Sequence, residues 1–480
     1  MSGIVGVQGK FQTKKLEGIL EKLEHRGPDG KRLYPNGNLA LGEVTSQYEL
    51  SLARENIYNS VLVLDGTPSY QGAKLSREEL FNFYLDNGPN IFKLLEDDFA
   101  IILTDGDKLV VARDIFGTRP LYYCKVQEGL VFASEIKALK ELDAEIKVFP
   151  PGTYYTTSDG FNRFKSVPEF NDDIEDSPGS ARYYQKAEEL NSLIEKAVKK
   201  NISENTRIGV FLSGGVDSSV IAAALSNVKK APIQTFAVGM KDCDDVLNAR
   251  KVSEYINSEH YELTYESQDM IDALPEVIYH LESFDVELVN SSIANYLVSK
   301  IAKEKGIELV LSGEGADELF GGYHHLKQYE TNEELNRELE LLLKGMHSGG
   351  LQRVDRMTKA HALNCQMPFF DSEIIEFARI LPYRWKISDS GMEKVILRQA
   401  FNGMLPDEVL WRKKSQFGIG SGNEDAMTNI INAQVTDKEL RMAKENYGIN
   451  FKSKAEYYYY KIFKEFYPDK VESMVNRWLA

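Results

Sequence analysis

The sequence predicts two unlike parts, an α+β sandwich followed by an α/β domain with a parallel sheet and a helical C-terminal part. Two patterns support this fold class. The first third of the chain carries short β-rich runs separated by turn residues, with few helical stretches, which is typical of antiparallel strands. The rest alternates apolar strands with helical stretches, which is typical of a parallel sheet covered by helices.

The sandwich is expected in residues 1–165. Its strand runs include SVLVLDG at 60–66, FAIILTDGDKLVVARD at 99–114 and GLVFASE at 129–135. The next stretch, 166–183, combines Pro, Gly, Ser and acidic residues with little apolar periodicity. We interpret it as a linker between two domains.

The α/β domain is expected in residues 184–480. Apolar strands RIGVFLS, IQTFAVG and IELVLSG alternate with helical stretches such as SSVIAAALSNV and SIANYLVSKIAKEKG. The tail from Asn332 onward is mostly helical in pattern, and we find no internal repeat.

Composition and charge exclude several classes of function. With 480 residues, 42% of them hydrophobic, the chain can bury more than one core. A formal net charge of -16 argues against a nucleic-acid or anionic-membrane partner, since phosphate backbones are held mainly by clustered Lys and Arg. Three distant cysteines indicate neither a disulfide framework nor a zinc site. Neither a signal peptide nor a membrane span is apparent, so we expect a cytoplasmic protein.

The strongest chemical signal is FLSGGVDSSVIAAAL, in which a β-run ends in two glycines and a helix follows. Glycines let the backbone approach an anion, while helix N-terminal N–H groups and serine hydroxyls donate to it. No lysine follows the glycines as in the usual P-loop, which favours pyrophosphate as the group gripped. Asp217 suits Mg²⁺, a hard cation that takes carboxylate and phosphate oxygens. The candidate phosphate-binding residues are Ser213, Gly214, Gly215, Asp217, Ser218 and Ser219.

A second acidic glycine loop follows another apolar strand in LVLSGEGADELFGGY. Gly313 and Glu314 open it, and Asp317 and Glu318 come next. Because the ends of parallel strands meet at one edge of a sheet, where ligands bind, we expect the two loops to lie together.

Ten segments in this order match a known family: HRGPDG (25–30), ARDIFGTRPLYY (112–123), FASEIKAL (132–139), FPPGTY (149–154), FLSGGVDSS (211–219), FAVG (236–239), LSGEGADELFGGY (311–323), MPFFD (367–371), MEKVILR (392–398) and WRKKSQF (411–417). Over nearly its whole length the sequence resembles asparagine synthetases and their relatives. The resemblance implies an N-terminal class II glutamine amidotransferase-like (Ntn-hydrolase) domain joined to an adenylate-forming ATP-pyrophosphatase domain.

The resemblance also implies roles for individual residues. The Ser-Gly-Gly turn, with Gly313 and Glu314, would hold ATP, and Val238 and Gly239 would border the adenine. Asp217 and Asp317 carry over as Mg²⁺ ligands. Lys414 carries over as the catalytic cation that stabilises the adenylation transition state and the departing pyrophosphate, where negative charge develops.

The N-terminal part departs from the family at its glutamine pocket. Glutamine-hydrolysing members begin Met-Cys-Gly-Ile, whereas this chain has Ser2. Asp65 and Thr67 replace the Asn and Glu of Asn-Gly-Glu, which places a carboxylate where an amide would stabilise an oxyanion. Val44 and Ser76 align with the Arg and Asp that bind glutamine. We therefore predict that the domain does not hydrolyse glutamine.

The synthetase part departs too. Asn364 aligns with the glutamate that deprotonates the incoming amine, Gln366 with the Arg after it, and Asn290 with another Arg. Asn cannot act as a base. His361 and Glu393 lie near the same motifs and are candidate replacements.

Three functions remain open. The first is an ATP-dependent, AMP-forming ligase that joins a carboxylic acid to ammonia, free or delivered by a partner. The second resembles β-lactam synthetases and related cyclases, which use an amine. The third is a non-catalytic nucleotide-binding scaffold. The intact Ser-Gly-Gly turn, both aspartates and Lys414 favour an enzyme. A homodimer is compatible with every one of these functions.

Overall fold

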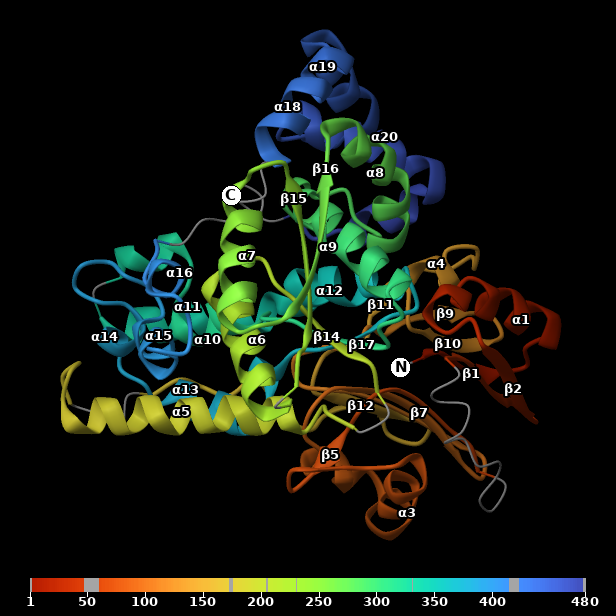
Figure 1. The fold of residues 1–480 in the computed structure, drawn as a ribbon. Coiled ribbons are helices and arrows are strands. Elements are labelled where there is room, and N and C mark those ends of the chain that lie inside the picture. The colour runs from red at the N-terminus through yellow and green to blue at the C-terminus, as the bar shows by residue number, and fades with distance from the viewer. Residues whose placement is uncertain are drawn as a thin grey trace.

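The structure is a computed structural model that describes residues 2–46, 60–171, 176–203, 206–229, 231–329, 331–413 and 423–477, with the side chains of 423–426 and 469 left aside. Figure 1 shows an N-terminal sandwich, red to orange, beside a parallel sheet that helices surround. Lys414 lies outside the described residues.

The N-terminal part packs two antiparallel sheets face to face. One has the order β11-β9-β10-β1-β3-β2 and the other β13-β12-β8-β7-β4. Gly6 lies where the sheets come closest, because a Cβ there would stand 2.7 Å from the Ile102 side chain. The strands are β1 (Gly3–Gly9), β2 (Gly30–Asn36), β3 (Leu39–Thr45), β4 (Leu62–Gly66), β5 (Ser69–Tyr70), β6 (Ala73–Lys74), β7 (Phe99–Asp105), β8 (Lys108–Arg113), β9 (Tyr122–Val126), β10 (Gly129–Ala133), β11 (Ile146–Val148), β12 (Thr153–Thr156) and β13 (Gly160–Arg163).

Helices cover the outer faces of the sandwich. Leu80 and Tyr84 of α3 pack on the apolar face of the second sheet, while Leu16 and Leu20 of α1 join the core beside the first sheet. The helical elements here are α1 (Thr13–Glu21), η1 (Glu24–Arg26), α3 (Arg77–Asn87), η2 (Gly88–Lys93) and α4 (Ile136–Leu139). The predicted α+β sandwich is confirmed, with more helix than the sequence pattern indicated.

The second part is built on a parallel five-stranded sheet of order β16-β15-β14-β17-β18. The helix α6 (Val216–Lys229) packs in the core, because its residues Val220–Leu225 are all buried, as their continuous apolar run predicts. The strands are β14 (Ile208–Phe211), β15 (Gln234–Met240), β16 (Glu259–Tyr265), β17 (Leu309–Leu311) and β18 (Asn364–Gln366). The predicted α/β class is confirmed.

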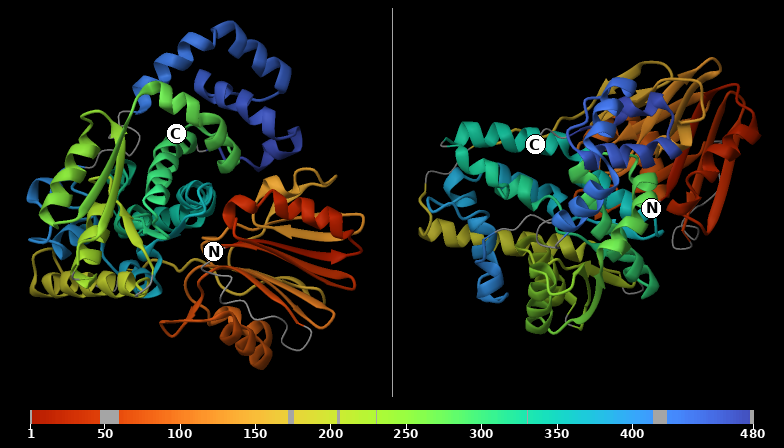
Figure 2. Two further views of the ribbon diagram at one scale, coloured as in Figure 1. Left: turned by 45° about the vertical axis from the view of Figure 1, so that its right-hand side comes forward. Right: turned by 90° about the horizontal axis from the view of Figure 1, so that it is seen from above.

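Most of the remaining described chain is helical. The helical elements are α5 (Ala181–Lys199), α6 (Val216–Lys229), α7 (Asp244–Tyr255), α8 (Ser267–Leu281), α9 (Val286–Glu304), α10 (Ala316–Phe320), η3 (His324–Gln328), α11 (Asn332–Gly345), η4 (Met346–Ser348), α12 (Gly350–Lys359), η5 (Pro368–Phe370), α13 (Ser372–Arg379), α14 (Tyr383–Lys386), α15 (Val395–Ala400), α16 (Asp407–Leu410), α18 (Asn423–Gln434), α19 (Asp437–Tyr447), α20 (Lys454–Phe466) and η6 (Asp469–Met474). Figure 2 shows the C-terminal helices, in blue, gathered over α8, which both α18 and α20 contact.

The predicted linker leads into α5. Ser180 caps this helix, because its hydroxyl accepts a hydrogen bond from the Tyr183 backbone N–H at 3.1 Å. The domain bounds 1–165, 166–183 and 184–480 stay predictions. In the described part of the chain, no helix is long and apolar enough to cross a membrane.

Candidate active site

The two glycine loops meet at the carboxyl edge of the parallel sheet, as expected. They follow β14 and β17, which are paired neighbours. Gly313 packs directly on the other loop, since a Cβ at this position would lie 2.7 Å from the Ser218 backbone nitrogen. Gly214 has a φ of 68°, which favours glycine. Close packing at Gly313 and the backbone conformation at Gly214 therefore explain why each loop contains glycine.

The Ser-Gly-Gly turn is held by its own serines. The Ser218 hydroxyl accepts a hydrogen bond from the Ser213 backbone N–H at 3.1 Å and lies 3.0 Å from the Ser213 hydroxyl. The Ser219 hydroxyl donates to the Gly215 carbonyl at 2.7 Å. Helix α6 begins directly after this turn, and the N–H groups of a helix's first turn favour an anion.

A buried lysine joins the two loops. The Lys394 ammonium lies 2.5 Å from carboxylate oxygens of both Asp217 and Asp317. Burial lowers the pKa of Lys394, but the two aspartates outweigh it and raise the pKa above its ordinary value. Lys394 belongs to the matched segment MEKVILR, yet nothing in that pattern pointed to this contact, because it joins residues 177 positions apart.

Mg²⁺ fits this pair of aspartates. Two carboxylates that share one ammonium are close enough to share a divalent cation. Within the described residues, no group of three or more His, Cys, Asp and Glu side chains could hold a metal ion. Phosphate oxygens and water would therefore complete the shell, as is usual for Mg²⁺. A Cβ at Gly322 would lie 1.8 Å from Asp317, so glycine leaves room for this carboxylate.

The acidic loop holds two further carboxylates. Glu314 forms an ion pair with Arg353 at 2.7 Å. Glu318 accepts a hydrogen bond from the Tyr323 hydroxyl at 2.5 Å. Burial, and then the nearby charges of Asp317 and Glu314, raise the pKa of Glu318 to about 8. The site therefore contains a carboxyl group that holds its proton near neutral pH, which the sequence analysis missed.

Two further residues that the sequence predicts for the nucleotide site lie on the strand next to β14. Val238 and Gly239 are buried on β15, the strand beside β14. Lys414 cannot be placed, but the chain before it is held by Arg398, which donates to the Arg412 carbonyl at 3.0 Å. Arg398 lies one helical turn after Lys394.

Residues at the predicted glutamine pocket of the N-terminal part form a buried cluster of charged and polar groups. Ser2 is fully buried, and its backbone N–H donates to Asp65 at 3.0 Å. The Arg26 guanidinium contacts the other Asp65 oxygen at 2.8 Å and the Ser2 carbonyl at 3.2 Å. Asp65 thus neutralises a cation at the position that the alignment gives to the oxyanion-stabilising amide.

The side chains at the other substituted positions of this pocket also have structural roles. Val44 is fully buried on β3. Ser76 caps α3, because its hydroxyl accepts from the Glu79 backbone N–H at 3.2 Å. The Thr67 hydroxyl donates to Asp98 at 3.2 Å.

The substituted positions of the synthetase part form hydrogen bonds as well. Asn364 lies at the start of β18, away from its carboxyl end, and accepts from Lys359 at 2.8 Å. Gln366 donates to the Thr67 hydroxyl at 3.0 Å, and Asn290 accepts from the Tyr459 hydroxyl at 2.5 Å.

The two candidate bases are poorly suited to that role. Burial lowers the pKa of His361 to about 4. Glu393 forms an ion pair with Lys327, and this contact, opposing burial, holds the pKa of Glu393 below its ordinary value. A strong neutral-pH base is supplied by neither side chain.

Buried ion pairs connect the two parts of the chain. Arg26 contacts Asp355 of α12 at 2.8 Å, and Arg356 contacts Glu135 at 3.4 Å. Burial alone would raise the pKa of Asp355, but Arg26 and Arg356 hold it below its ordinary value. The N-terminal part is therefore docked through charges that depend on one another.

Comparisons with known proteins agree with these features. A family model for asparagine synthase matches residues 189–334 and 324–479, and one for a glutamine amidotransferase domain matches residues 72–160. An Arabidopsis thaliana protein, asparagine synthetase [glutamine-hydrolyzing] 3, is 33% identical over 98% of this chain and 88% of its own length. A Gallus gallus asparagine synthetase [glutamine-hydrolyzing] is 36% identical over 80% and 75%. Asparagine synthetase B [glutamine-hydrolyzing] from Escherichia coli (strain K12) is 31% identical over 96% and 89%. The chain therefore belongs to the asparagine synthetase family, whose members are AMP-forming carbon–nitrogen ligases.

Proposed function

We propose that this protein activates a carboxylic acid with ATP and Mg²⁺ and transfers the activated acid to ammonia or another amine. The protein does not produce this nitrogen donor by hydrolysing glutamine itself. The observation that carries the proposal is the meeting of Asp217 and Asp317 at one cation position beside the Ser-Gly-Gly turn.

The chain's own groups suit this chemistry. The turn and the first N–H groups of α6 bind phosphate oxygens, while the two aspartates hold a cation beside them. Mg²⁺ supplies positive charge to the phosphate oxygens when it is bound. Lys394 partly offsets the charge of the two aspartates without metal. Lys414, as the family pattern implies, adds positive charge that stabilises the transition state.

The loss of glutaminase activity is supported by the buried pair Ser2 and Asp65. If Met1 is removed, Asp65 lies beside the new amine and favours its protonated form. An N-terminal nucleophile needs a neutral amine as its base, so this contact would remove the base. The thiol is absent because residue 2 is serine. The amidotransferase domain is present, and only its hydrolytic chemistry is proposed to be lost.

An amine-ligating reaction, as in β-lactam synthetase-like enzymes, is the second candidate. It is favoured by three uncharged side chains, Asn290, Asn364 and Gln366, at the positions aligned with family Arg, Glu and Arg. Their amide groups bind other side chains of the protein. A substrate with the charges of aspartate would find fewer partners here.

The test is pyrophosphate release from ATP and Mg²⁺ across a panel of carboxylic acids, each with glutamine, ammonia or a primary amine. We expect release that depends on the acid, and product with ammonia or an amine but none with glutamine. Product from glutamine with free glutamate would contradict the proposed nitrogen source. Absence of release with every acid would favour the scaffold function.

A further inference from the structure

A buried lysine lies at the junction of the two parts of the chain. Lys359, the last residue of α12, is 1% exposed. Its amine donates to the Asn364 side-chain oxygen at 2.8 Å, which is its one hydrogen bond within the described residues. No carboxylate among those residues forms an ion pair with it. A buried lysine that lacks such a partner is stabilised in its neutral form.

The charges around Lys359 pair with one another. Burial lowers the pKa of Lys359 to about 7. Asp65 and Asp355 raise this pKa, whereas Arg26 and Arg119 lower it. Arg26 contacts both aspartates at 2.8 Å, so these neighbouring charges largely offset one another. A large fraction of the Lys359 side chain is therefore an uncharged amine at neutral pH.

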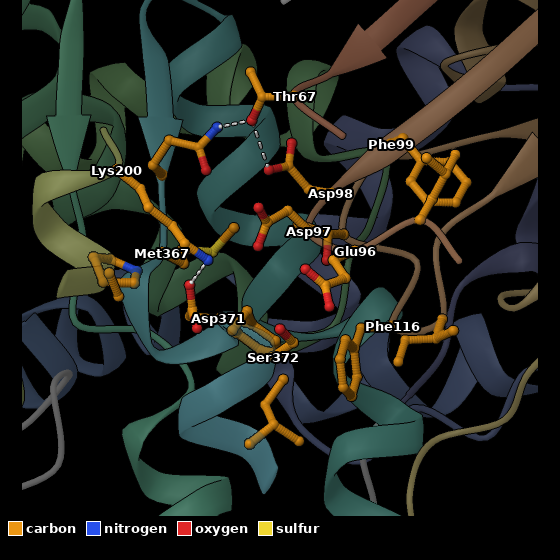
Figure 3. A pocket seen from close by; sticks show the side chains of 18 of the residues that line it. Thr67, Glu96, Asp97, Asp98, Phe99, Phe116, Lys200, Met367, Asp371 and Ser372 are labelled. Carbon is orange, nitrogen blue, oxygen red and sulfur yellow. Dashed lines mark hydrogen bonds and ion pairs between the residues drawn. The ribbon is translucent and has the colours of Figure 1, made fainter. Parts of the chain in front are cut away.

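The lysine contacts the strand that leads to the acidic loop. Alternate residues of a strand share a face, and both Asn364 and Gln366 of β18 bind groups on the side of the N-terminal part. Gln366 donates to the Thr67 hydroxyl, which in turn donates to Asp98 (Figure 3). The Gln366 carbonyl accepts from the Ser312 backbone N–H at 3.0 Å, at the start of the acidic loop. At about 3.3 Å per residue, Asn364 lies about 7 Å along the strand from this contact.

An amine that attacks an acyl adenylate has to lose a proton. Its nitrogen forms a bond to the carbonyl carbon, the bond from that carbon to the AMP oxygen breaks, and AMP leaves with the electron pair. A base whose pKa lies near the working pH accepts the proton of the nitrogen most effectively. Asn364 cannot be this base, and His361 and Glu393 are poorly suited to the role.

We propose that Lys359 is the base that takes this proton and that Asn364 orients it through their hydrogen bond. The inference rests on the proposed function, because it concerns the transfer step of that reaction. A neutral lysine amine that donates one hydrogen bond to Asn364 keeps its lone pair for the proton. Lys359 is an amine before the transfer and an ammonium after it.

The experiment follows two steps on the full-length protein, with the carboxylic acid that supports pyrophosphate release. ATP–pyrophosphate exchange reports adenylation, and amide formation with a primary alkylamine reports transfer. Lys359→Met should lower amide formation by about 100- to 10,000-fold and leave exchange near the unaltered rate, because the base acts only in transfer. Lys359→Arg should lose as much, since a guanidinium keeps the hydrogen-bond donors but cannot be deprotonated.

Lys303→Met is the matched control. Lys303 is exposed and donates to the Ala362 carbonyl at 3.0 Å, so it holds the same loop between α12 and β18 from outside. This variant should form the amide as the unaltered protein does.

The pH dependence separates a base from a structural lysine. The logarithm of kcat/KM for the amine should rise with a slope of about 2 below pH 7, where both the amine and Lys359 have to lose a proton. The slope should fall to about 1 between pH 7 and the pKa of the alkylamine, which is about 10. In Lys359→Met the slope should be about 1 over the whole range.

Amide formation at the unaltered rate by Lys359→Met or Lys359→Arg, or the same slopes in Lys359→Met and the unaltered protein, would overturn the assignment. Equal losses of exchange and amide formation in Lys359→Met would show a structural role and overturn it too. In each of these cases exchange by the unaltered protein would still support the proposed function. Absence of exchange by the unaltered protein with every acid would instead overturn the proposed function, and this inference with it.

Discussion

Lys394→Met tests the shared cation position of Asp217 and Asp317 most sharply. The substitution keeps most of the side-chain volume but removes the ammonium that both carboxylates contact. Because each oxygen lies 2.5 Å from that nitrogen, the two oxygens are at most about 5 Å apart. Without the ammonium, this cation no longer offsets the repulsion between the two carboxylates.

The cost can be estimated from this geometry. Both aspartate side chains are 23% exposed, so an effective dielectric constant near 20 is appropriate. Two unit charges about 5 Å apart then repel by about 3 kcal/mol. For a chain of this size we expect a fall in Tm of roughly 3–6 °C in the absence of metal.

Mg²⁺ should reverse much of this loss. In the variant, Mg²⁺ can take the place of the ammonium beside Asp217 and Asp317, and its binding stabilises the folded state by mass action. The measurement is Tm by differential scanning calorimetry, in EDTA and in excess Mg²⁺, without nucleotide. Lys251→Met is the control, because Lys251 forms an exposed ion pair with Glu408 and its loss should cost about 0–1 kcal/mol, with no rescue.

Two results would refute this reasoning. An unchanged Tm of Lys394→Met in EDTA would mean that the carboxylates do not depend on the lysine. A loss that Mg²⁺ leaves unchanged would mean that the pair cannot hold the metal.

Three further predictions concern other parts of the chain. Burial raises the pKa of Asp97 to about 6, so the folded state loses stability as the pH rises from about 4 to 6. Asp97→Asn should therefore raise Tm at pH 7.5. In a pH series of melting curves this gain should vanish below about pH 4. Arg26→Met should destabilise the protein by about 3–5 kcal/mol, because it removes the guanidinium that several buried carboxylates contact. Arg182→Met is the control and should change Tm little, because the Arg182 ion pair is exposed. Equal Tm values for both variants would contradict the docking role of Arg26. Glutamine should yield no glutamate in an enzymatic glutamate assay, and Ser2→Cys alone should not restore release, because Asp65 still holds the residue-2 nitrogen; release by either protein would count against the loss of glutaminase activity.

Local sequence patterns predicted much of the fold. The run FAIILTDGDKLVVARD corresponds to β7 and β8, which pair through the turn at Gly106. The strand β18 has only three residues, Asn364–Gln366, and its place in the sheet depends on pairing with β17, which a local pattern cannot show. The helices that cover the sandwich were underestimated, because α3 is weakly amphipathic and is fixed by its Ser76 cap and by tertiary packing.

The sequence predicted those parts of the candidate site that consist of glycine loops at the ends of parallel strands. The convergence of the two loops required only the rule for parallel strands. Lys394, Arg353 and the proton-holding Glu318 could not be found in this way, because their roles arise from contacts between segments distant in sequence and from burial. Lys414 lies outside the described residues, so its catalytic role stays a prediction.

The most direct test of the account is ATP–pyrophosphate exchange, with the carboxylic acid that supports pyrophosphate release, in the unaltered protein and in Asp217→Asn and Asp317→Asn. The account predicts carboxylate-dependent exchange in the unaltered protein and a fall of several orders of magnitude in each variant, since phosphate charge at the reacting centre loses its cation. Exchange near the unaltered rate in both variants would place the nucleotide chemistry elsewhere and contradict the account.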